Sequence, residues 1–261
     1  MKERIHVPPG RDGWANIRRM PARQHPRHRH DQFELNLVVR GRSTYLVGNR
    51  LVAMTRDHLI ALYPDEEHNL VEESHDHELW IAVWQPAVMD RLMSGARREW
   101  TQPKPTGEIL WRLEPARARS LAGIFTAARE VTDDTAANAC LAALLLTAYE
   151  AASVAPRGIT TAVHPAVEAA ARRLRADPQL DGLALARAVG LSRGRLSRLF
   201  HEQVGVPLAT YRNRLRLERA RDLMADGRHN LLEAALTAGF GSYAQFHRVV
   251  RAQLGVSPRE L

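Results

Sequence analysis

Three side chains near the start of the chain have the types and spacing of transition-metal ligands. His28, His30 and Glu34 occupy positions of equal parity, so on one extended strand both imidazoles and the carboxylate would point to the same face. A neighbouring strand could bring His68 beside them. Three histidines and one glutamate suit one divalent Fe, Mn, Ni, Co or Zn ion and leave positions open for water or a ligand. The sequence therefore predicts a candidate metal site at these four residues.

The same strand allows a second interpretation, in which these side chains only face water. Every second residue from Phe33 to Val39 is apolar and would form the opposite face of the strand. If only that apolar face packs in a core, the side chains of His28, His30 and Glu34 lie on the opposite, solvent-exposed face. The metal site and the solvated face both remain open at this point.

The first motif continues into a longer pattern. Six residues separate Glu34 from Gly41, and His68 follows later. This spacing resembles the cupin fold, a small β-barrel, although Asp57 and Asp65 stand where its second motif usually has glycine. The resemblance implies a barrel that binds a small-molecule effector, with or without a metal, because cupin sensors often keep the histidine pair while binding an organic molecule. It leaves open a cupin metalloenzyme, an oxygenase or isomerase, with its chemistry at the same four ligands.

Several short segments must form the sheet that positions these residues. Between residues 33 and 84, apolar or alternating runs are separated by turn residues, which is typical of a sandwich or barrel. The segment His75-Asp76-His77, beside two glutamates, is predicted to be a polar loop. The predicted strands are Phe33–Val39, Thr44–Val47, Leu51–Met54, Leu59–Tyr63 and Leu79–Trp84.

Beyond residue 90 the pattern becomes helical. Ala116–Val131 and Asp134–Val154 are rich in Ala and Leu, and the second is apolar nearly all round. Such a helix is buried or paired, so it either forms a homodimer through residues 116–154 or is the layer on which the barrel packs. Cys140, the single cysteine, is expected to have a packing role there. Pro156-Arg157-Gly158 predicts a linker. The predicted organisation is therefore a cupin-like domain at 1–90, a helical segment with the linker at 91–158 and a DNA-binding domain at 159–261.

The charge of the chain is concentrated in its last hundred residues. Residues 162–261 contain 16 Lys and Arg against 9 Asp and Glu, a net charge of +7. Residues 1–161 contain 21 against 20, a net charge of +1. A genome-wide preference for arginine would act on both parts, so the asymmetry indicates a surface that binds phosphates.

Residues 183–211 and 231–261 repeat one pattern. Ala186 and Ala235 each precede by four residues a glycine, Gly190 or Gly239, which is followed by a large apolar residue. Small residues let two helices approach closely, and glycine adopts the positive φ of a tight turn. Each repeat then has a serine placed to cap the next helix, and closes on Gly-Val. The repeat predicts two helix-turn-helix units joined by a connecting helix, Tyr211–Ala225.

This layout over residues 163–261 resembles the AraC/XylS family of transcription regulators. The matching motifs are Arg216-Leu217-x-x-Ala220 in the connecting helix and Ala238-Gly239-Phe240-x-Ser242 in the second unit. Pro207 and the chain end at Leu261 depart from the family pattern only near the caps. The fold class is therefore α+β: a cupin-like barrel followed by helices, then an all-α double helix-turn-helix domain.

The resemblance implies which residues contact DNA. Each second helix would enter a major groove, and two held about 34 Å apart could contact adjacent grooves. Arg198 and Arg248 occupy equivalent positions and are the best candidates for base or phosphate contacts. Arg195 and Arg251 more readily hold phosphates, whereas Leu196, Phe200, Phe240 and Phe246 are expected in the core. The implied DNA-binding residues are Arg193, Gly194, Arg195, Ser197, Arg198, Tyr243, Ala244, His247 and Arg248.

Together these observations predict a sequence-specific regulator of transcription, not an enzyme. Its expected partners are double-stranded promoter DNA, a small-molecule effector, a second copy of the chain and RNA polymerase. The polar start of the chain lacks the apolar run of a signal peptide, and the apolar stretch 136–149 is shorter than a membrane span. A cytoplasmic location without membrane contact is therefore expected. A non-specific nucleic-acid-binding protein is the remaining alternative.

Overall fold

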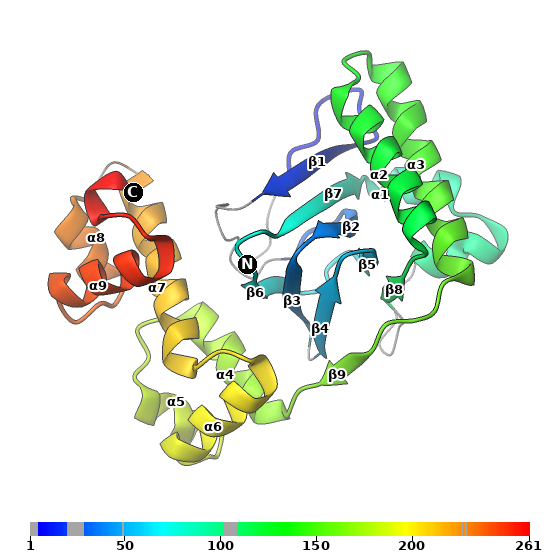
Figure 1. The fold of residues 1–261 in the computed structure, drawn as a ribbon. Coiled ribbons are helices and arrows are strands. Elements are labelled where there is room, and N and C mark those ends of the chain that lie inside the picture. Colours follow the sequence, from blue (N-terminus) through cyan, green and yellow to red (C-terminus); the bar gives the residue numbers. More distant parts are fainter. Residues whose placement is uncertain (1–4, 20–28, 49, 102–108, 226, 228) are drawn as a thin grey trace. The chain divides into compact units, whose positions relative to one another are not determined.

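The computed structural model describes residues 5–19, 29–48, 50–101, 109–225, 227 and 229–261. The chain divides into two compact units, with the boundary between Thr161 and Ala162. The first unit combines strands with helices and the second is helical (Figure 1). The predicted α+β class, with a barrel-like N-terminal part and an all-α C-terminal part, is confirmed.

Two antiparallel sheets form the first unit. The larger has the strand order β1-β7-β2-β5-β8, and the smaller has the order β6-β3-β4-β9. The larger sheet contains β1 (Gly13–Arg19), β7 (Glu78–Trp84), β2 (Phe33–Arg40), β5 (His58–Leu62) and β8 (Leu110–Arg112). The smaller contains β6 (His68–Glu73), β3 (Arg42–Val47), β4 (Arg50–Thr55) and β9 (Thr160–Ala162). All five predicted strands are present as β2, β3, β4, β5 and β7, and β1, β6, β8 and β9 are additional.

β2, in the middle of the larger sheet, is buried on both faces over most of its length. β2 lies between β5 and β7, and Asn36 is opposite Ile60 on one side and Ile81 on the other. Glu34 and Asn36 share the face of β2 that is turned away from the helices, and both are buried. The interpretation that this face of β2 is exposed to solvent is therefore wrong, because the second sheet covers it.

Two long helices cover the other face of this sheet. α2 (Pro115–Glu130) and α3 (Asp134–Val154) lie alongside each other against it (Figure 1). Trp80 stacks on Phe125 with ring centroids 5.6 Å apart, and the Trp84 Nε1 donates to the carbonyl of Leu141 at 3.1 Å. The helices share one core with the strands, so they are the layer on which the barrel packs. Cys140 is half-buried against this core.

By length and composition alone, α3 could cross a membrane. The apolar stretch 136–149, from which the sequence was judged, is shorter than the helix itself. Its Leu141, Leu144 and Leu145 are buried against the sheet and α2. A core helix of a soluble protein has this composition for the same reason, since its apolar side chains need a packed environment. Two short helices, α1 (Pro86–Leu92) and η1 (Gly95–Thr101), complete the unit.

The second unit is built around one central helix, α7 (Leu208–Ala225). Near its start Tyr211 packs on Phe200, with ring centroids 5.2 Å apart. Further along, Leu217 and Ala220 share a core with Phe246. α7 thus contributes to both halves of the unit. The other helices are α4 (Pro165–Ala176), α5 (Gly182–Ala188), α6 (Arg193–Val204), α8 (Leu231–Thr237), α9 (Tyr243–Leu254) and η2 (Pro258–Glu260).

Candidate nucleic-acid interface and sensor site

The predicted repeat folds as two helix-turn-helix units, α5–α6 and α8–α9. The turn glycines adopt positive φ, +71° at Gly190 and +100° at Gly239. Ser192 accepts a hydrogen bond from the backbone N–H of Arg195 at 3.3 Å, and Ser242 accepts one from Gln245 at 3.2 Å. These caps satisfy N–H groups that the first turn of a helix leaves free. The local sequence therefore sets where α6 and α9 begin.

Each second helix has one buried face and one exposed face. Leu196 and Phe200 in α6 are buried, as are Phe240 and Phe246 in the second unit, so the predicted core residues are confirmed. Arg198 and Arg248 are exposed at equivalent positions. The exposed residues among the predicted DNA contacts are Arg193, Gly194, Arg195, Ser197, Arg198, Ala244, His247 and Arg248.

Tyr243 is the exception among the predicted contacts. Its ring lies 6.0 Å from that of Phe246 and 6.5 Å from that of His247, and the residue is half-buried. Part of this side chain therefore packs on the core of the second unit.

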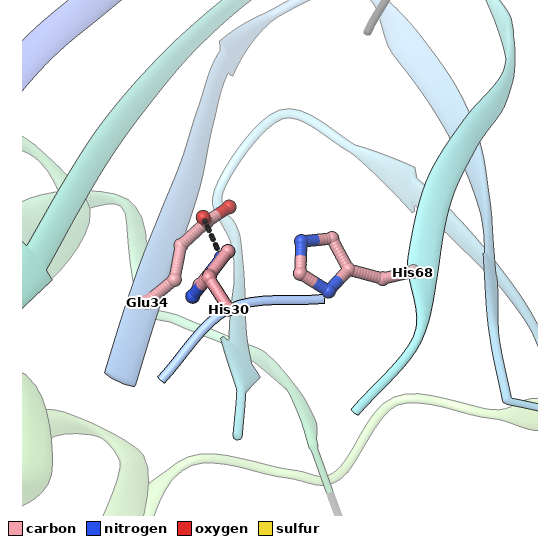
Figure 2. Close-up of side chains that lie close together, drawn as sticks. All are labelled: His30, Glu34 and His68. Atoms are coloured by element: carbon pink, nitrogen blue, oxygen red, sulfur yellow. Dashed lines mark hydrogen bonds and ion pairs between the residues drawn. The ribbon is translucent and has the colours of Figure 1, made fainter. Parts of the chain in front are cut away.

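Three of the predicted metal ligands come together in the first unit. His30, Glu34 and His68 place one ligand atom each within 4.8 Å of one another, and their exposed fractions are 1%, 7% and 1% (Figure 2). The Nε2 of His30 is 3.1 Å from a carboxylate oxygen of Glu34. The rings of His30 and His68 lie edge to face, with centroids 5.1 Å apart. His28 lies outside the described residues.

His30 and Glu34 do not lie on one strand, contrary to what their equal parity predicted. β2 begins only at Phe33, so His30 approaches Glu34 from the segment that precedes the strand (Figure 2). A bend at Asp31 and Gln32 separates the two residues. The predicted single strand is therefore wrong for His30, because alternation of side chains applies only within extended backbone. The proximity of His30 and Glu34 comes from the bend instead.

Hydrogen bonds to the backbone orient both imidazoles. The Nδ1 of His30 is 3.0 Å from the carbonyl of Gln32, and the Nδ1 of His68 is 2.9 Å from the carbonyl of Glu66. A carbonyl only accepts, so each Nδ1 carries the proton, and a neutral ring then presents an Nε2 lone pair. Asn36 also donates to Glu34 at 2.7 Å. An Nε2 lone pair facing a carboxylate oxygen needs a cation or proton between them, so this donor set fits a metal ion.

A second polar cluster lies in the same unit, and the sequence did not predict it. Arg18 donates to both carboxylate oxygens of Glu73, with Nη2 and Oε1 2.8 Å apart. The Nδ1 of His77 lies 3.0 Å from Glu73, and His77 is buried. His75–His77 lies in a turn between β6 and β7, as predicted, but His77 is buried in that turn. Arg18 and Glu73 lie far apart in sequence, so no local pattern joins them. The sequence feature that could have pointed to this cluster was the pair of glutamates, Glu72 and Glu73, close to His77.

Several buried polar atoms in the first unit have no hydrogen-bond partner among the described residues. Among them are Asn36 Oδ1, Ser43 Oγ and His77 Nε2. Ser43 is opposite Glu73 in the pairing of β3 with β6, and Asn36 is next to Glu34 along its face of β2. Buried polar atoms are usually satisfied. Water molecules or a polar ligand would satisfy these atoms.

Family comparisons match both units. The description "AraC-like ligand binding domain" matches residues 17–149, slightly more than half of the chain. The description "Helix-turn-helix domain" matches residues 185–261. The first match covers β2 to β8, the cluster of His30, Glu34 and His68, all of α2 and most of α3. The second covers both helix-turn-helix units.

Individual proteins are similar over different lengths. The HTH-type transcriptional activator RhaS of Salmonella arizonae is 25% identical, with 97% of this chain and 93% of that protein covered. The arabinose operon regulatory protein of Escherichia coli K12 is 33% identical over 33% of this chain and 29% of its own length. The solved structure of fatty-acid-bound ToxT from Vibrio cholerae has a TM-score of 0.40 and 15% identity, over 95% of this chain and 94% of that one.

The named relatives RhaS and the arabinose regulator are regulators of transcription. The family matches agree with the two units that the structure shows and with the repeat in the second unit. The chain belongs to the AraC family of transcriptional regulators, with an N-terminal AraC-like ligand-binding domain and a C-terminal helix-turn-helix DNA-binding domain.

Proposed function

We propose that this protein is a cytoplasmic regulator that binds promoter DNA through α6 and α9 and changes this binding when its barrel takes up a small-molecule effector. One observation carries the proposal: both second helices bury their apolar residues and expose an arginine at equivalent positions, Arg198 and Arg248. The net charge of +7 in residues 162–261 supports binding to phosphates. The buried polar atoms of the first unit that have no hydrogen-bond partner among the described residues support the proposal of an effector that forms hydrogen bonds.

His30, Glu34 and His68 would hold one divalent transition metal in the barrel, with His28 as a candidate fourth ligand. The orientation of both imidazoles by backbone carbonyls supports this, because metal-binding histidines commonly donate from the other ring nitrogen. A bound metal would supply open coordination positions for an effector oxygen or nitrogen. The named relatives are regulators, so the site serves sensing here rather than turnover.

The metal proposal predicts a large effect of one substitution. Natively purified protein is expected to contain metal near stoichiometry by elemental analysis, and His30→Ala is expected to lose it because the imidazole supplies a ligand. His75→Ala is the matched control, since His75 is an exposed histidine outside the cluster. If no preparation contains metal, the proposed metal site is contradicted, and the barrel would be a site for an organic effector alone.

The two long helices would also form a homodimer interface. α3 buries three of its four leucines in the core and exposes small residues, Ala139, Ala143 and Thr147, on its other face. Small side chains let two helices approach closely. RNA polymerase is the further protein partner proposed at the promoter, because RhaS is named a transcriptional activator.

The dimer proposal predicts a change in mass. Light scattering at micromolar concentration is expected to give the mass of a dimer for the wild-type protein and of a monomer for Ala143→Arg, because the larger charged side chain separates the helices. Ala87→Arg, at an exposed alanine of α1, is expected to remain a dimer. A wild-type monomer under these conditions would rule out this interface.

A further inference from the structure

The two helix-turn-helix units are joined by a side-chain contact as well as by α7. Gln179 lies between α4 and α5, in the first half of the DNA-binding domain. Its Nε2 donates to the carbonyl of Thr237 at 2.9 Å, and Thr237 is the last residue of α8 in the second half. A single side chain thus bridges the two halves near the turn that leads into α9.

The second turn is shaped to receive this bridge. A Cβ on Gly239 would lie 2.8 Å from the Gln179 Cγ and 3.2 Å from the Arg216 Nε. Gly190, at the equivalent turn of the first unit, has nothing within 4 Å of the same position. Both glycines satisfy a positive φ, but only Gly239 must also leave room for a neighbouring segment. This difference between the two repeats points to a specific contact at the second turn.

Arginines of α7 hold the segment that carries Gln179. Arg216 is 7% exposed, and its Nε donates to the carbonyl of Pro178 at 2.8 Å. Its Nη2 donates to the carbonyl of Gln179 itself at 3.4 Å. One turn earlier on α7, Arg212 donates to the carbonyl of Leu180 at 3.3 Å. Three successive carbonyls are therefore fixed to the central helix, so the position of Gln179 is set before it reaches Thr237.

We propose that Gln179, held by Arg216 and seated against Gly239, is a positioning residue that fixes the relative orientation of α6 and α9. It acts through the turn between α8 and α9 and does not itself contact DNA. Two binding modules held at a fixed spacing bind a double site more tightly than two loosely tethered ones, because the second contact is made at a higher effective concentration. The bridge therefore contributes to affinity for two correctly spaced half-sites, and to discrimination between spacings.

The test uses a duplex that the full-length wild-type protein selects from a random-sequence library. A second duplex has one half-site replaced by random sequence, and a third has one base pair added between the half-sites. Gln179→Ala is expected to bind the intact duplex roughly threefold to tenfold more weakly, the cost of one hydrogen bond. Its affinity for the half-replaced duplex is expected to be unchanged, and its penalty for the added base pair smaller than that of wild type.

Two controls separate positioning from general loss of structure. Gln203→Ala removes a glutamine whose side chain also bonds to the backbone, accepting from the N–H of His164 at 2.8 Å, but within the first half alone. It is expected to keep the wild-type response to spacing. Gly190→Ala and Gly239→Ala each place a Cβ at a turn of positive φ, but only at Gly239 would that Cβ meet Gln179, so only Gly239→Ala is expected to relax the spacing preference.

The proposed bridge is contradicted if Gln179→Ala loses the same affinity for all three duplexes, or if its affinity changes for none of them. The inference rests on the proposed use of α6 and α9 for DNA recognition. If that use were wrong, Arg198→Ala and Arg248→Ala would bind as wild type. If only the bridge were wrong, these two variants would be impaired and Gln179→Ala would behave as wild type.

Discussion

Replacing Arg198 or Arg248 by alanine is expected to weaken binding to a selected duplex by about 1–3 kcal/mol each. Both side chains are exposed near the middle of α6 and α9. A guanidinium can donate two parallel hydrogen bonds to a guanine edge or to a phosphate, which is why its loss is costly. Fluorescence anisotropy at one fixed salt concentration would measure the change, because phosphate contacts make every affinity depend on salt.

Arg172→Ala is a suitable control for this experiment. Arg172 is exposed on α4 of the same domain, where it faces Glu168 at 3.8 Å, and it is not on a recognition helix. It is expected to change binding little. Competition with random DNA then separates a specific regulator from a non-specific binder, whose affinity would not depend on sequence. If Arg198→Ala and Arg248→Ala both bind like wild type, the assignment of the recognition helices fails.

The second large effect is expected at Glu73, which is buried between Arg18 and His77. Glu73→Gln is expected to lower the free energy of unfolding by about 3–5 kcal/mol, because it leaves a buried guanidinium without its counter-charge. The side chains of Arg18 and Glu73 are only 11% and 2% exposed. Chemical denaturation of the full chain, followed by tryptophan fluorescence, would measure the loss, since most tryptophans are buried in this unit.

The same cluster makes stability depend on pH. Burial by itself would raise the pKa of Glu73, but hydrogen bonds from Arg18 and His77 and the charge of Arg18 hold it below the usual value. A carboxylate with a lowered pKa in the folded state adds stability above its unfolded pKa, and this stability is lost as the pH falls through the folded pKa. Wild-type stability is therefore expected to decrease below about pH 4.3, the ordinary pKa of glutamate, and Glu73→Gln to lose this part of the decrease.

A neighbouring ion pair provides the control. Arg19 and Glu78 join β1 to β7, at 3.5 Å, but their side chains are 58% and 32% exposed. Glu78→Gln is expected to change stability by at most about 1 kcal/mol, as solvent screens an exposed pair. In the double variant Arg18→Met with Glu73→Leu, most of the lost stability should return, because two apolar side chains can replace a buried pair. Equal effects of Glu73→Gln and Glu78→Gln would contradict the buried network.

Much of this architecture could be predicted from local sequence. The bounds of α3 agree with the predicted helix because Asp133 caps its start, accepting from Ala136, and an uninterrupted Ala- and Leu-rich run follows. The two helix-turn-helix units could be predicted because glycine at positive φ and serine at the cap are local requirements that recur in both repeats. The same reasoning placed Leu196, Phe200, Phe240 and Phe246 in the core.

The tertiary structure decided which distant residues meet. His68 joins His30 and Glu34 through the packing of two different sheets, and Arg18 reaches Glu73 from the edge strand β1. Gln179 meets Thr237 because α7 fixes the two halves of its unit. By itself the sequence determined the elements, their caps and turns, and the family motifs, since these depend on neighbours along the chain. Contacts between segments far apart depend on register and packing, which no local pattern encodes.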